Sequence, residues 1–85
     1  LYFYSRDFEK QNRGLQKSTL LKLAKLIDVF INNPFNSMLH TKPLTGNYTG
    51  HYSFRITREY RVIFRFIDPT SAYFVAIGQR KDIYR

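Results

Sequence analysis

Residues 52–66 read Tyr52-Ser-Phe-Arg-Ile-Thr-Arg-Glu-Tyr-Arg-Val-Ile-Phe-Arg-Phe66, and this stretch decides the fold. Apolar and polar residues alternate on both sides of the polar pair at positions 58 and 59, which indicates two strands joined by a tight turn. Successive side chains of a strand point to opposite faces of its sheet. We therefore expect one apolar face and one face that carries Arg55, Arg61 and Arg65 in contact with solvent.

The residues before this hairpin predict a short strand and two helices. Residues 1–4 favour a strand, and Ser5 is a suitable N-cap for a helix that runs to Gly14. Ser18 is the expected N-cap of a second helix, which should end at Asn32-Asn33-Pro34 because a residue before proline disfavours helical geometry. The apolar stripe expected on this second helix consists of Leu20, Leu23, Ile27 and Phe30, widened by Leu21, Ala24 and Ile31.

The residues after this helix predict a loop and one more strand. Residues 34–50 are rich in Pro, Gly and Asn and favour a loop, while residues 68–71 favour a turn. Residues 72–77 should form a strand in which Tyr73, Val75 and Ile77 share a face. The expected fold is a single α+β domain of residues 1–85, with the order β-α-α-β-β-β and a two-helix hairpin on one face of a mostly antiparallel four-stranded sheet. Its predicted core joins two sets of side chains: Tyr60, Val62 and Phe64 from the sheet, and Leu23, Ile27 and Phe30 from the helix.

The composition favours a polyanionic partner. The chain has 14 Lys and Arg against 6 Asp and Glu, a formal charge of +8 on 85 residues, and such an excess suits nucleic acid first and an acidic protein segment second. There is no cysteine, which excludes a disulfide framework and is compatible with the cytoplasm. No apolar run approaches the ~20 residues that span a bilayer. His40, His51 and the scattered acids show no metal-ligand spacing, so we expect no metal and no cofactor.

A basic protein without a metal can still cleave RNA. The reaction needs a group that helps to deprotonate the 2′-hydroxyl, cations that stabilise the phosphorane, and an acid that protonates the leaving oxygen. Arginine suits the second task because its planar guanidinium is always charged and pairs with phosphate oxygens. Tyr84 is a candidate for the acid, or for a side chain that stacks on a base. Exposed arginines on a strand are also compatible with a merely solvated face.

Four short motifs, taken in order, resemble the RelE/ParE superfamily of bacterial type II toxin–antitoxin toxins. The motifs are Lys42-Pro43-Leu44-Thr45-Gly46, Tyr52-Ser53-Phe54-Arg55-Ile56, Glu59-Tyr60-Arg61-Val62-Ile63-Phe64 and Ile77-Gly78-Gln79-Arg80-Lys81-Asp82-Ile83-Tyr84. The resemblance covers residues 42–84. It implies a RelE-like toxin that acts as a ribosome-dependent endoribonuclease on messenger RNA and that a cognate antitoxin neutralises.

The resemblance also implies roles for individual residues. Arg61 matches the family's phosphate-stabilising arginine, Arg55 its basic residue on the preceding strand, Arg80 its arginine after the last strand and Tyr84 its C-terminal tyrosine. The expected RNA-binding residues beside these catalytic candidates are Lys42, His51, Arg58, Arg65 and Lys81.

The general base is the role that the resemblance leaves open. The chain departs from the family at Gln79, where many members carry His, and at Lys42, where some carry Glu. Lys42 and His51 are the candidates that remain, and His51 is equally compatible with a surface residue that only forms hydrogen bonds.

Three other functions fit the same residues. The ParE branch of the superfamily inhibits DNA gyrase and does not need the nuclease residues. A non-catalytic RNA-binding module would use the arginines for phosphates and Tyr52, Tyr60 and Tyr84 for stacking. A degenerate toxin would only bind the antitoxin.

Overall fold

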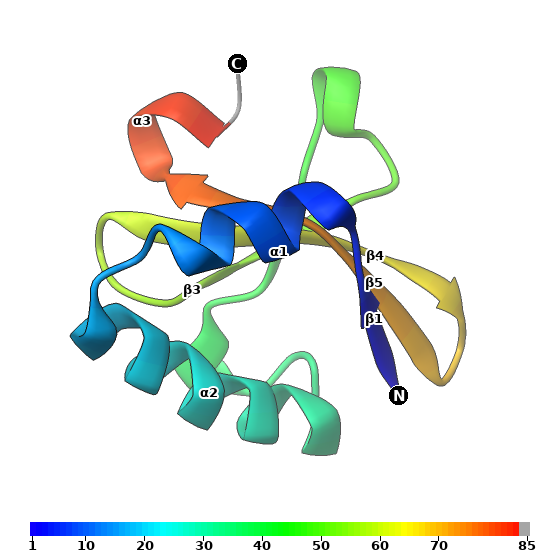
Figure 1. The fold of residues 1–85 in the computed structure, drawn as a ribbon. Coiled ribbons are helices and arrows are strands. Elements are labelled where there is room, and N and C mark those ends of the chain that lie inside the picture. The colour runs from blue at the N-terminus through cyan, green and yellow to red at the C-terminus, as the bar shows by residue number, and fades with distance from the viewer. Residues whose placement is uncertain (84–85) are drawn as a thin grey trace.

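The hairpin of residues 52–66 is present and forms the centre of the sheet (Figure 1). The computed structural model describes residues 1–83. The elements are β1 (Tyr2–Tyr4), α1 (Arg6–Arg13), α2 (Lys17–Asn32), β2 (Lys42–Pro43), β3 (Tyr52–Arg55), β4 (Tyr60–Asp68), β5 (Ser71–Gln79) and α3 (Arg80–Ile83), with short 3-10 helices η1 (Ser37–Leu39) and η2 (Gly46–Tyr48).

The five strands form one sheet in the order β1-β5-β4-β3-β2. β1 runs parallel to β5 and the other neighbours are antiparallel, so the predicted α+β fold with a mostly antiparallel sheet is confirmed. The expected number of four strands was one too low, because β2 lies inside the segment that was predicted to be a loop. It has only two residues, and the second is a proline, so it is too short to show the alternation of apolar and polar residues that indicates a strand.

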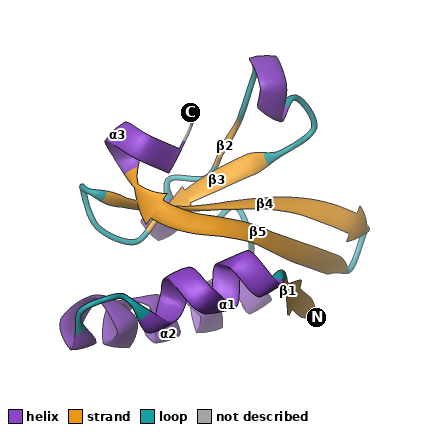
Figure 2. Cartoon of the chain, turned by 45° about the horizontal axis from the view of Figure 1, so that its top comes forward, coloured by secondary structure: helices purple, strands orange, loops and turns teal. Residues whose placement is uncertain are grey.

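Helices α1 and α2 lie on one side of the sheet, whereas α3 and the segment that contains η2 lie on the other side (Figure 2). Ser5 caps α1 as predicted: its hydroxyl oxygen accepts a hydrogen bond from the Phe8 nitrogen at 2.9 Å and its hydroxyl donates to the Val75 oxygen at 2.7 Å. One residue thus begins the helix and ties it to β5. None of the helices in residues 1–83 has both the length and the apolar character that crossing a membrane requires.

The core between α2 and the sheet is built from aromatic rings. The Phe30 ring lies 5.4, 4.9 and 5.1 Å from the ring centroids of Phe54, Phe64 and Phe74. Such edge-to-face and tilted ring pairs add to the stabilisation that burial itself provides. Val62 and Phe64 are fully buried as predicted, but Tyr60 is only partly buried.

Helix α2 is rotated slightly from the orientation that its sequence predicted. Its buried positions are Thr19, Leu23, Leu26 and Phe30, whereas Leu20 and Ile27 are half-buried. Leu21, Ala24 and Ile31 do not widen the stripe and are exposed. The N-cap is Gln16 rather than Ser18. Several adjacent apolar residues offered two possible stripes, and contact with the sheet selects one of them.

Strand β5 departs from simple alternation. The register between β4 and β5 shifts after the pair Ile63 and Ala76, and the next partners are Phe64 and Phe74. The extra residue, Val75, forms a bulge, which changes the face on which later side chains lie. The prediction that Tyr73, Val75 and Ile77 share a face was therefore wrong. The buried residues of β5 are Ser71, Ala72, Phe74 and Ile77.

Candidate functional site

The sheet face opposite α1 and α2 carries the predicted basic residues, and we call it the basic face: Lys42, Arg55, Arg61 and Arg65. Directly paired residues of neighbouring strands point to the same side of a sheet. Arg55 pairs with Arg61, which in turn pairs with Gly78. In the adjacent row, Lys42 pairs with Ser53. The structure thus brings Arg55 and Arg61 to one face, as the sequence predicted, and adds Lys42, which was expected in a loop.

Arg61 is buried, which corrects the prediction that its side chain faces solvent. Its exposed fraction is only 6%. Its Nη1 donates hydrogen bonds to the carbonyl oxygens of Thr57 and Arg58, at 2.8 and 2.9 Å. These bonds direct the guanidinium toward the turn between β3 and β4. Arg61 therefore stabilises this turn in addition to any part it plays toward RNA.

Burial on this face results from α3 and η2. Gly78, the partner of Arg61, lies under α3, since a Cβ at this position would be 3.7 Å from the Ile83 Cβ. The Tyr48 hydroxyl, at the end of η2, donates to the Ile83 carbonyl oxygen at 3.4 Å. Ile63, on the same side as Arg61, has no exposed surface. The face is thus covered in part by two short segments that the sequence analysis did not predict as helices.

Three further basic residues are exposed at the same end of the sheet. Arg58 lies in the β3–β4 turn, and Arg80 and Lys81 begin α3. The Arg80 nitrogen donates to the Glu59 carbonyl oxygen at 2.6 Å, so the turn and the start of α3 are adjacent. We call the four arginines at this end of the sheet the arginine cluster: the exposed Arg55, Arg58 and Arg80, and the buried Arg61.

Arg65 does not belong to this cluster. It lies four positions beyond Arg61 on β4, which is ~13 Å along an extended strand. Its guanidinium carbon is 5.2 Å from the centroid of the Tyr73 ring, a cation–π contact. Arg65 is exposed and can still contribute to general attraction of a polyanion.

His51 is poorly placed to act as a base. It is half-buried, with its ring 5.8 Å from that of Tyr48, and its Nδ1 is buried without a hydrogen-bond partner among residues 1–83. A buried nitrogen cannot reach the 2′-hydroxyl of a bound RNA, so only the other ring nitrogen of His51 could contact one.

Two further points concern Tyr84 and the acidic and histidine side chains. Tyr84, the expected acid, lies outside the described residues. Within residues 1–83, no three His, Asp or Glu side chains gather into a group that could hold a metal ion.

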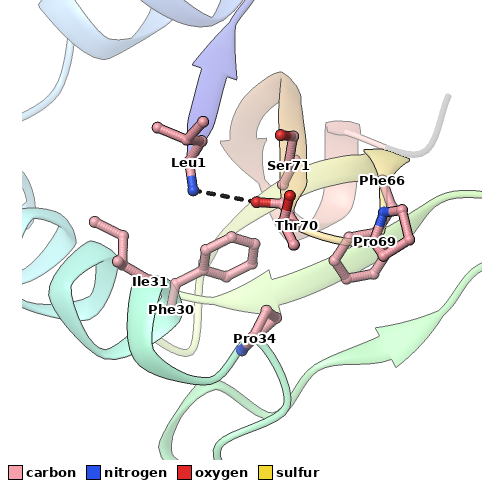
Figure 3. A pocket seen from close by; sticks show the side chains of 9 residues that line it. Leu1, Phe30, Ile31, Pro34, Phe66, Pro69, Thr70 and Ser71 are labelled. Atoms are coloured by element: carbon pink, nitrogen blue, oxygen red, sulfur yellow. Dashed lines mark hydrogen bonds between the residues drawn. The ribbon is translucent and has the colours of Figure 1, made fainter.

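A cavity of about 230 Å³ lies far from the arginine cluster, beside the turn at the other end of β4 (Figure 3). Phe30, Phe66 and Pro69 are among the residues that line it. Across it, the Leu1 nitrogen donates to the Thr70 carbonyl oxygen at 3.2 Å. This cavity has no basic side chain, so it does not extend the site.

Residues 3–80 match a family model that describes the YoeB-like toxin of bacterial type II toxin–antitoxin systems. The chain belongs to this family. The match spans α1, α2, the sheet apart from Tyr2, and the first residue of α3, and it agrees with the resemblance inferred from residues 42–84. No curated protein sequence matches the chain.

Solved structures share the fold of this YoeB-like toxin. YafQ from Escherichia coli strain BL21(DE3) superposes with a TM-score of 0.83 at 21% identity, covering 100% of this chain and 98% of YafQ. A YoeB/ParE toxin from Agrobacterium tumefaciens gives 0.80 at 19% identity, with 93% and 96% covered. The YoeB–YefM complex from Staphylococcus aureus gives 0.77 at 20% identity, with 92% and 93% covered.

Proposed function

We propose that this toxin is a metal-free endoribonuclease that cleaves messenger RNA on the ribosome through attack of a 2′-hydroxyl on the adjacent phosphate. The observation that supports this most is the direct pairing of Arg55 with Arg61. Like charges directly opposite each other in a sheet are destabilising. A phosphate bound at Arg55 would offset that repulsion, and exposed Arg58 and Arg80 lie near the pair.

The arginines have different tasks in this proposal. Arg55 and Arg80 are exposed and contact the phosphate oxygens, where charge-assisted bonds are strongest as negative charge develops. Arg61 is buried and bonded to the turn, so it acts as a positioning residue. It fixes the backbone that carries Arg58 and adds its charge from beside Arg55. Fixed donors stabilise a transition state without reorganising during the reaction.

The proton transfers need two more groups. We assign the acid to Tyr84, on the resemblance to the RelE/ParE superfamily. We place Lys42 rather than His51 next to the 2′-hydroxyl, where its ammonium stabilises the oxyanion while the proton leaves to water. Lys42 is exposed and lies one row from Arg55 on the basic face, whereas Nδ1 of His51 is buried.

The partner in this proposal is a cognate antitoxin with an acidic segment that covers the basic face. The family model names toxin–antitoxin systems, and two structures with this fold are the YoeB–YefM complex and the E. coli DinJ–YafQ complex. A net charge of +8 provides the electrostatic complementarity. Co-expression with the adjacent small reading frame should yield a stable complex, and a toxin that purifies alone from that co-expression would contradict the assignment.

Cleavage of messenger RNA on programmed ribosomes tests the nuclease directly, with a gyrase supercoiling assay run beside it. We expect RNA products with 2′,3′-cyclic phosphate ends and unchanged supercoiling. Inhibition of supercoiling with intact RNA would instead assign the toxin to gyrase. If a folded toxin neither cleaves the RNA nor inhibits supercoiling, the nuclease proposal is refuted.

A further inference from the structure

A second basic site lies beside the arginine cluster, in a cavity of about 400 Å³ between α2, η1 and the β3–β4 turn. We call it the basic cavity. Lys22, His40, Arg55 and Arg58 line it, together with Leu26 and Ile56 and two further uncharged residues. None of its lining residues is acidic. Neither Lys22 nor His40 has a part in the function proposed above.

The basic cavity combines charge with an apolar floor. Leu26 and Ile56 are 6% and 1% exposed and form the fixed bottom of the cavity, whereas Met38, 61% exposed, supplies its accessible apolar surface. Lys22, His40, Arg55 and Arg58 are all exposed around it. Its volume is within the range of small-molecule sites, ~300–1,000 Å³. An apolar surface surrounded by cations fits a ligand that has both a flat ring and a phosphate.

The backbone at His40 is unusual. His40 has φ 51 and ψ 40, and it is the only residue other than glycine with a positive φ in residues 1–83. A residue with a Cβ is strained in this region. Glycine would adopt it freely, yet the chain places an imidazole there, at the cavity.

The cavity is continuous with the arginine cluster. Arg55 and Arg58 belong to both, and the Thr57 and Arg58 carbonyl oxygens accept the bonds of Arg61. We infer that the basic cavity binds a nucleotide of the RNA that neighbours the cleaved phosphate, with Lys22 and His40 at its phosphate and the base against Met38. This inference rests on the proposed function, since it extends the RNA path beyond the arginine cluster.

The test is binding of an eight-nucleotide RNA in which every 2′-hydroxyl is methylated, so that attack by a 2′-hydroxyl is blocked. Lys22→Ala is compared with Lys25→Ala, which removes the same charge from an exposed position of the same helix that does not line the cavity. We expect Lys22→Ala to weaken binding about five-fold. It should also reduce the slope of log affinity against log salt concentration by about 0.7. Lys25→Ala should weaken it by less than about two-fold. Equal effects of the two variants on RNA binding would overturn the assignment of a nucleotide site to the basic cavity.

A second variant, His40→Gly, removes the imidazole and relieves the backbone. We expect weaker binding of the same RNA without loss of thermal stability, and unchanged binding would also overturn the assignment. Because this RNA is not cleaved, the result is independent of the nuclease. If the toxin leaves messenger RNA intact but Lys22→Ala binds RNA more weakly than Lys25→Ala, the binding site in the basic cavity stands and the proposed nuclease activity is refuted. If the wild type cleaves messenger RNA but the two variants bind RNA equally, the nuclease stands and the binding site in the cavity is refuted.

Discussion

The two faces of the sheet differ in how they are covered. Toward α1 and α2, Phe54, Phe64 and Phe74 meet the Phe30 ring in a continuous aromatic core. On the basic face, the cover is η2 and the four-residue helix α3, and the residues buried there include a charged arginine, Arg61.

This difference shows what alternation in a sequence can establish. A period of two tells which side chains share a face, and it correctly grouped Arg55, Arg61 and Arg65. It does not tell whether something covers that face. Coverage here depends on short segments whose position is set by tertiary contacts, such as that between Ile83 and Gly78.

The largest effect is expected for truncation of the aromatic core. Phe30→Ala should lower the free energy of unfolding by ~3–5 kcal/mol, because it removes a buried ring and leaves a cavity. Chemical denaturation measures this loss. Leu21→Ala is the control, since Leu21 lies on the same helix and is 58% exposed. A loss of less than ~1 kcal/mol for Phe30→Ala would show that the rings do not form the core described.

Next in size is removal of the buried arginine on the other face. Arg61→Ala should lower the free energy of unfolding by ~1–3 kcal/mol, because two hydrogen bonds from a charged donor are lost. An exposed arginine would give a change within ~0.5 kcal/mol. Arg61→Lys keeps the positive charge but lacks the planar guanidinium with its several N–H donors, so it should recover only part of the lost stability. A melting temperature of Arg61→Ala equal to that of wild type would contradict the burial.

The covering layer itself can be weakened at Gly78. A Cβ there would be 3.7 Å from Ile83, so Gly78→Ala should fit, whereas the two methyl groups of Gly78→Val should displace α3. We expect trypsin to cut after Arg80 and Lys81 several-fold faster in Gly78→Val than in Gly78→Ala. Equal rates would mean that α3 does not rest on this part of β5.

The smallest effect concerns Asp68, at the far turn of β4. The Thr70 backbone N–H bonds the Asp68 carboxylate at 2.8 Å and lowers the pKa of this exposed group below its usual 3.8. Its contribution to stability is therefore present above the unfolded pKa and lost as the pH falls through the lowered folded value. An NMR titration should place the Asp68 midpoint below 3.8, and a midpoint at or above that value would contradict the turn geometry.

Much of the fold could be predicted from the sequence because it depends on local signals. The alternation at residues 52–66, the Ser5 cap and the stop at Pro34 each have a direct physical cause. The bulge at Val75 and the choice of Leu26 over Ile27 depend on how α2 and the strands fit together. They could not be read from either segment alone.

The sequence indicated which basic residues form the candidate site better than it indicated how they are buried and bonded. Arg55 and Arg61 lie together as expected, Lys42 lies on the same face, and Arg58 and Arg80 join them at the turn. The burial of Arg61 was missed, because no pattern in residues 80–83 indicates a helix that packs on Gly78. Lys22 and His40 were missed because their elements meet the β3–β4 turn only in the folded chain.

The central claim is that the arginine cluster cleaves RNA, and Arg55 tests it most directly because it is exposed and not bonded to the turn. The measurement is single-turnover cleavage of ribosome-bound messenger RNA by wild type, Arg55→Ala and Arg65→Ala, each shown to melt at the same temperature. We predict that Arg55→Ala is slower by ~10²–10³, the loss expected for one electrostatic stabiliser, and that Arg65→Ala is slower by less than ~10 because it lies outside the cluster. Equal rates for the two variants, or no cleavage by wild type, would contradict the account.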